Sequence, residues 1–220
     1  MSTRIATRAA TGRRRARLGA TAGMVGAAGF VAVFTVEGWR RPGHHPSSMF
    51  VSELSLGPSG WVQITNFLVT GAMIFTFGRG LAAHFRDGPG SLAGPVLVQI
   101  IGMSLLASGP FTTDPSAMFN QVSAHGLIHG VFGALVFALA PVSCFVFHRR
   151  FREDPAWRPV ASWTLAAGVI LTVGDIALKA SQAPSTPLFP FKGLVQRAIL
   201  VTFMGWLFAV AARTYRQAFA

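Results

Sequence analysis

Six long runs of apolar residues fill most of the chain, and short polar connections separate them. Each run is long enough for an α-helix that crosses a bilayer, which takes about 20 residues to span a ~30 Å hydrocarbon core. The connections are too short to hold a soluble domain. The pattern therefore predicts an all-α, polytopic transmembrane bundle of six spans. These spans are Leu18–Val36, Trp61–Ala83, Leu92–Gly109, His125–Phe147, Val160–Leu178 and Gly193–Ala212.

The composition supports a membrane protein and excludes a nucleic-acid-binding one. Apolar residues make up 51% of the chain and charged residues 12%, and the mean hydropathy is +0.49. A net charge of +12 can indicate a nucleic-acid partner, but here the arginines flank apolar runs instead of forming a basic face. The expected partner is the lipid bilayer, and no nucleic acid is expected.

The positions of the basic residues predict the orientation. Most of the 19 lysines and arginines lie in the N-terminal segment, the second and fourth connections and the C-terminal segment. The positive-inside rule then places both termini in the cytoplasm. We expect a multi-pass protein of a prokaryotic cell membrane. The basic residues on the opposite side are Arg40, Arg41, Lys179, Lys192 and Arg197.

The first residues of the chain differ in composition from the rest. Residues 1–16 are rich in arginine, alanine and threonine and show no pattern of buried positions. We expect them to form a disordered cytoplasmic tail. Residues 17–216 then form the six-helix transmembrane domain.

Polar residues collect at the exoplasmic ends of the predicted spans. A charge in the middle of a membrane helix costs about 2.5–3.5 kcal/mol, so such residues indicate a function or a partner. Because the spans alternate in direction, polar residues far apart in sequence share one depth. The predicted ligand-binding residues at this depth are Glu53, Asn66, Asp114, His125, His129, Asp175 and Arg197.

Two groups of polar residues also have a structural interpretation. Gln63, Asn66 and Thr70 recur on one helical face and can join helices by hydrogen bonds. Asp175 and Lys179 lie four residues apart with the acid first, an order that favours an ion pair within the helix.

The fourth span opens with two histidines four residues apart, a spacing that can hold one zinc ion. Gly126 stands where the zinc proteases of the HExxH class have their catalytic glutamate, so that class is excluded. We expect no metal and no cofactor, and histidines that form hydrogen bonds. The alternative is zinc held by His125, His129 and an acid, Asp114 or Glu53. The glycines Gly126 and Gly130 are expected to pack against another helix.

Several of these motifs together resemble one known family. They are the segment Ser52-Glu53-Leu54-Ser55-Leu56-Gly57-Pro58-Ser59-Gly60-Trp61, the turn Thr113-Asp114-Pro115, His125-Gly126, His129-Gly130 and Gln196-Arg197. Over roughly residues 20–213 the chain resembles the prokaryotic family catalogued as domain of unknown function 998. Thr112 departs from the proline expected there. The resemblance implies a bundle of about six or seven transmembrane helices and brings no established reaction.

Three functional hypotheses follow from the sequence. In the first, the protein is not an enzyme and binds a small polar ligand or a lipid headgroup in an exoplasmic pocket. In the second, it is a metal-dependent membrane hydrolase that uses His125 and His129 to activate water. In the third, it is a structural or accessory membrane subunit whose charges pair only with each other.

Overall fold

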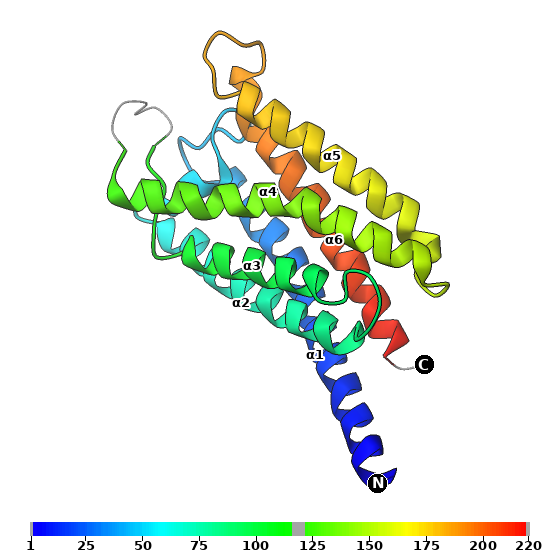
Figure 1. The fold of residues 1–220 in the computed structure, drawn as a ribbon. Coiled ribbons are helices and arrows are strands. Elements are labelled where there is room, and N and C mark those ends of the chain that lie inside the picture. The colour runs from blue at the N-terminus through cyan, green and yellow to red at the C-terminus, as the bar shows by residue number, and fades with distance from the viewer. Residues whose placement is uncertain (1, 116–121, 219–220) are drawn as a thin grey trace.

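The computed structural model describes residues 2–115 and 122–218, and within these ranges it is helical and contains no strand (Figure 1). The prediction of an all-α protein is confirmed. Three short 3-10 helices, η1, η2 and η3, lie in the connections. The α-helices are α1 (Ser2–Arg40), α2 (Gly60–His84), α3 (Ala93–Ala107), α4 (Ala124–Glu153), α5 (Ala161–Ala180) and α6 (Lys192–Gln217), and the 3-10 helices are Val51–Ser55, Arg158–Val160 and Phe189–Phe191.

Five helical segments are long and apolar enough to cross a membrane: Ala10–Arg40, Gly60–His84, Ala124–Glu153, Arg158–Ala180 and Phe189–Gln217. The remaining helix, α3, has 15 residues. At 1.5 Å per residue it is about 22 Å long, which is less than the ~30 Å hydrocarbon core. The third predicted span therefore forms a shorter helix than its apolar length suggested.

Successive helices run in opposite directions, so the connections divide between two ends of the bundle (Figure 1). We call one end the distal end, which holds residues 41–59, 108–115 and 181–191. The other, the terminal end, holds residues 85–92 and 154–160, the start of α1 and the end of α6. Helix α2 packs between α1 and α3, while α1 also packs on α6. The first turns of α1 and the last turns of α6 thus lie on the same side of the bundle.

The arginine-rich N-terminal segment differs from the expected disordered tail, because it is helical and continues into the apolar part of α1. Alanine and arginine are among the strongest helix formers, which explains why the helix extends this far. Its last turns also pack on the bundle. Ala16 is buried, and the Arg17 guanidinium lies 5.9 Å from the centre of the Tyr215 ring.

Glycines bring α2 into close contact with both of its neighbours. A Cβ atom on Gly19 of α1 would lie 2.6 Å from the Cα of Gly80, and one on Gly102 of α3 would lie 2.4 Å from the backbone nitrogen of Phe75. Small residues allow such close approach of helices in a membrane. These contacts make α1, α2 and α3 one tightly packed layer.

Aromatic side chains hold the other helices together near the terminal end. Phe151 of α4 stacks on Trp157 with ring centres 4.4 Å apart, and Phe147 packs on Trp206 of α6 at 5.7 Å. Gly168 of α5 lies against Phe145 of α4. From this region α4 and α5 diverge toward the distal end (Figure 1).

Candidate functional site

A cavity of about 550 Å³ lies where α4 and α5 diverge, and we call it the distal cavity. The side chains of η1, Thr113 and the first turn of α6 complete its wall. The α4 wall contains Gly130 and Gly133, and a Cβ atom on either glycine would meet nothing within 4 Å. Gly130 therefore borders open space, and the expectation that it packs against a neighbouring helix is wrong. The polar residues of the wall are Ser52, Thr113, His129, Asp175, Lys179, Gln182 and Gln196.

A smaller space of about 50 Å³, the inner chamber, adjoins the distal cavity and reaches the centre of the bundle. The two spaces share five wall residues, among them His129, Phe137 and Gln196. The inner chamber ends among the apolar side chains of Phe30, Val51, Phe67, Leu105, Val136 and Leu200. The combined space is therefore polar near its mouth and apolar at its inner end.

His129 lies where the distal cavity meets the inner chamber. Its side chain is buried, and its Nδ1 atom lies 2.8 Å from the carbonyl oxygen of Phe111. Since a carbonyl oxygen can only accept, Nδ1 carries the proton, and Nε2 of the neutral ring is a hydrogen-bond acceptor. The ring also meets Phe67 edge to face, with centres 5.8 Å apart. These two contacts fix the orientation of the imidazole.

Asp175 of α5 contributes a carboxylate to the cavity wall. Its Oδ1 atom is buried and has no hydrogen-bond partner among the described residues. The expected ion pair with Lys179 does not form, since the ion pairs with described positions are Glu37–Arg41, Arg149–Glu153 and Arg150–Asp154. The exposed Lys179 ammonium is strongly hydrated, which outweighs the small energy of an intrahelical pair.

Arg197 holds the segment 41–59 over the distal end instead of facing the cavity. Its Nη1 donates to the carbonyl oxygens of Pro46 and Met49, both at 2.7 Å, and to that of Gly193 at 3.1 Å. The start of α6 approaches this segment closely, since a Cβ atom on Gly193 would lie 2.4 Å from the Met49 oxygen. The neighbouring Gln196 adds a further link, because its Oε1 accepts from the backbone nitrogen of Val51 at 2.7 Å.

His44 is the side-chain partner of Arg197. Its Nε2 lies 2.9 Å from Nη2 of Arg197. Burial, together with the positive charge of Arg197, lowers the pKa of His44 from 6.5 to about 4. The ring is therefore neutral at pH 7, and Nε2 accepts a hydrogen bond from the guanidinium.

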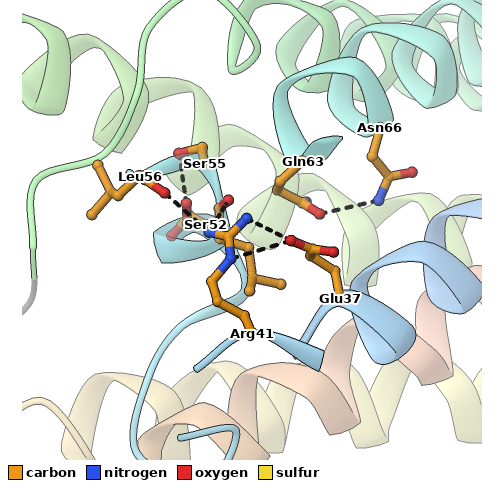
Figure 2. A network of polar contacts seen from close by, with 8 residues as sticks. Glu37, Arg41, Ser52, Ser55, Leu56, Gln63 and Asn66 are labelled. Atoms are coloured by element: carbon orange, nitrogen blue, oxygen red, sulfur yellow. Dashed lines mark hydrogen bonds and ion pairs between the residues drawn. The ribbon is translucent and has the colours of Figure 1, made fainter. Parts of the chain in front are cut away.

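Arg41, the first residue after α1, holds the later part of the same segment (Figure 2). Its Nη1 donates to the carbonyl oxygens of Leu54 at 2.5 Å and Leu56 at 3.0 Å. Its Nη2 pairs with Oε1 of Glu37 at 2.7 Å. The Arg41 and Arg197 guanidinium groups therefore fix the segment 41–59, and with it the η1 wall of the distal cavity.

Glu53 and Asn66, both predicted to bind the ligand, have contacts elsewhere. Glu53 is buried, and its Oε2 accepts from the backbone nitrogen of Phe50 at 2.7 Å at the start of η1. Asn66 donates to the carbonyl oxygen of Phe30 at 3.3 Å and to Oε1 of Gln63 at 3.2 Å (Figure 2). Asn66 thus links α2 to α1, in agreement with the structural interpretation of this polar face.

Asp114 and His125 lie at the start of α4. The Asp114 carboxylate accepts from the backbone nitrogen of Ser123 at 2.9 Å, next to a helix N-terminus that favours negative charge. A Cβ atom on Gly126 would meet Oδ2 of Asp114, so a larger residue there would force this carboxylate to move. His125 is exposed, and its ring meets Phe111 edge to face at 5.6 Å.

The alternative zinc site is not assembled in the described part of the chain. Within residues 2–115 and 122–218, no group of three or more His, Cys, Asp or Glu residues is close enough to hold a metal. His125 and His129 instead interact with Phe111 in different ways: the His125 ring packs edge to face with the Phe111 ring, and the His129 ring donates to the Phe111 carbonyl oxygen.

Of the seven predicted ligand-binding residues, the distal cavity brings together only His129 and Asp175. Sequence reasoning missed Ser52, Gln196 and Thr113 as wall residues. A signal was available, because each lies next to a predicted residue or motif: Ser52 precedes Glu53, Gln196 precedes Arg197, and Thr113 precedes Asp114. A neutral side chain costs less to insert into a membrane than a charged one, so its position in an apolar run is weaker evidence of a function.

Comparison with known proteins gives one match. The model of the family described as "Protein of unknown function (DUF998)" matches residues 24–213. This range begins within α1, ends within α6 and includes every wall residue of the distal cavity. No curated protein and no solved structure matches the chain. The family match confirms the resemblance seen in the sequence, and the chain belongs to the DUF998 family.

Proposed function

We propose that all six helices cross the bilayer of the cell membrane, with both termini in the cytoplasm and the distal end on the exoplasmic side. The connections before and after α3 lie at opposite ends of the bundle (Figure 1), which supports a crossing by this short helix. Arg79, Arg86 and the arginine-rich start of α1 gather at the terminal end, as the positive-inside rule requires of a cytoplasmic face.

Within this frame, we propose that the protein binds an amphipathic small molecule or lipid in the distal cavity, without transforming it. The observation that carries the proposal is Oδ1 of Asp175, which is buried in the cavity wall and has no hydrogen-bond partner within residues 2–115 and 122–218. An unsatisfied buried polar atom costs about 1–3 kcal/mol, and a hydroxyl or amine of a ligand would remove that cost.

The shape and size of the cavity support the same ligand class. Its volume of about 550 Å³ lies within the range of small-molecule sites, roughly 300–1,000 Å³. The polar mouth suits a headgroup that meets Asp175, Gln196 and Nε2 of His129. The apolar inner chamber suits the first part of a hydrocarbon chain. The divergence of α4 and α5 provides an entrance from the bilayer.

Mass spectrometry of the protein purified in mild detergent tests this proposal. We expect a copurifying amphiphile in the wild-type protein and its loss in Gly133→Leu, because leucine would fill the cavity beside His129. Gly205→Leu is the matched control, since Gly205 is an exposed helical glycine in open space on α6. Equal amounts of the same molecule in all three proteins would refute binding in the distal cavity.

The hydrolase and accessory-subunit hypotheses predict different results. A hydrolase would carry zinc on His125 and His129, whereas the proposal requires no metal. An accessory subunit would carry no bound amphiphile in any variant, and its charged residues would affect stability alone.

A further inference from the structure

A second cavity of about 560 Å³ lies at the terminal end, on the outer face of α2 between α1 and α3. We call it the basic groove. Its polar residues include Arg15 of α1, Arg79 of α2 and Gln99 of α3, and Leu18 and Phe75 are among its apolar ones. It shares no residue with the distal cavity. It is therefore a separate site from the one proposed above.

The close packing of α2 explains why a groove forms here. Gly80 contacts Gly19 of α1, and a Cβ atom on Gly78 would lie 2.6 Å from Cγ of Gln99 on α3. Because these glycines bring three backbones together, small residues such as Ala83 cover the floor between them. The result is a groove with an apolar floor and cationic groups at its edge.

The two arginines of the groove are available to a ligand. Both are exposed, and the structure gives neither guanidinium a hydrogen bond or ion pair within the described residues. Elsewhere at the terminal end, Arg150 pairs with Asp154 at 3.6 Å and Arg213 donates to the carbonyl oxygen of Ala156. No acidic residue lines the groove. Its charge is therefore uncompensated by the described chain.

We propose that the basic groove binds the headgroup phosphate of an anionic phospholipid, with an acyl chain along its apolar floor. The planar guanidinium presents paired donors that match phosphate oxygens. Arg79 lies near the end of α2 (Gly60–His84), where a long side chain reaches the headgroup region while its stem stays in the hydrocarbon. Both the charge and the floor thus fit a membrane lipid better than a free anion.

Native mass spectrometry of the full chain in detergent, titrated with dioleoylphosphatidylglycerol, tests this inference. We expect one lipid to bind with at least tenfold higher affinity than dioleoylphosphatidylcholine. The double variant R15Q/R79Q should bind phosphatidylglycerol roughly 10- to 30-fold more weakly, as loss of two interfacial arginines predicts. The affinity of Arg79→Lys for phosphatidylglycerol should lie between those of the wild type and the double variant, because lysine keeps the charge but lacks the paired donors of arginine.

The matched control is R152Q/R216Q, which removes two exposed arginines from the same end outside the groove. It should change the affinity less than about twofold if the site is specific. An equal loss in both double variants would overturn the proposal in favour of diffuse surface attraction. Equal affinities for the two lipids, or displacement of the lipid by a 100-fold excess of inorganic phosphate, would also overturn it. The melting temperatures of both double variants should match, which excludes misfolding as the cause.

Discussion

Replacement of Arg197 by alanine should destabilise the protein far more than replacement of any exposed arginine. The guanidinium donates to the carbonyl oxygens of Pro46 and Met49 in the segment 41–59 and contacts His44. Hydrogen bonds to a charged group contribute about 1.5–3 kcal/mol each. Loss of the two carbonyl contacts alone therefore predicts a destabilisation of about 3 kcal/mol.

The assay is thermal unfolding of the detergent-solubilised protein. For a chain of this size, about 1 kcal/mol shifts the melting temperature by roughly 2–4 °C, so Arg197→Ala should melt about 6–12 °C lower. Arg216→Ala is the control, because Arg216 is exposed in the last turn of α6. Its effect should stay within about 0.5 kcal/mol.

Hydrogen exchange locates the effect. In Arg197→Ala, the backbone amides of residues 44–51 should exchange faster, while those in the middle of α2 should not change. Equal melting temperatures for Arg197→Ala and Arg216→Ala would refute the reasoning, since Arg197 would then interact mainly with water or lipid headgroups.

Three further predictions concern other parts of the chain. The folded protein holds the pKa of His44 at about 4, below its ordinary 6.5, so the unfolded state binds a proton more readily. The stability of the folded protein should therefore fall as the pH is lowered from 6.5 to 4. Melting curves across this pH range should show the loss in the wild type and much less of it in His44→Gln. Metal analysis should find well below one zinc per chain, and His129→Gln should melt closer to the wild type than His129→Leu, because glutamine can still donate to the Phe111 carbonyl; near-stoichiometric zinc that vanishes in both His125→Ala and His129→Ala would contradict this. Reporters inserted at residues 154 and 185 should report the cytoplasm and the exoplasm, respectively, and the same side for both would refute the proposed topology.

The sequence predicted the helices well because the length of an apolar run is a local property. Each predicted span coincides with most of one helix, and the third, which is already the shortest predicted span, forms the shortest α-helix, Ala93–Ala107. There the sequence Ser108-Gly109-Pro110 follows the end of α3 at Ala107, and Gly and Pro stop a helix whatever the hydropathy of the residues around them. The arginine-rich start of α1 shows the reverse effect, since helix propensity extends the helix into a polar segment.

The candidate site was harder to predict, because its main contacts join distant residues through backbone atoms. Arg197 and Pro46 are 151 residues apart in sequence, and Gln196 and Val51 are 145 apart. Every residue type has a backbone carbonyl oxygen, so the sequence does not reveal which residues accept hydrogen bonds from an arginine that binds the backbone. Arg197 was therefore predicted to bind the ligand, because it lies at the same depth as the other polar residues and has no evident partner in the sequence. His129 and Asp175 were found because an ionisable residue within an apolar run is conspicuous by itself.

The segment 41–59 connects the stability of the protein to its proposed ligand site, and this connection gives a final prediction. Ser52 of η1 forms part of the distal cavity wall, and Val51 is bonded to Gln196, next to Arg197. Since Arg197 holds the segment without lining the cavity, Arg197→Ala should lower both the melting temperature and the amount of copurified amphiphile. Gly133→Leu should lower the amount of amphiphile with little change in the melting temperature of the lipid-free protein, because it adds a side chain to open space. If Arg197→Ala released the segment in hydrogen exchange yet retained the amphiphile fully, the ligand site would be independent of η1.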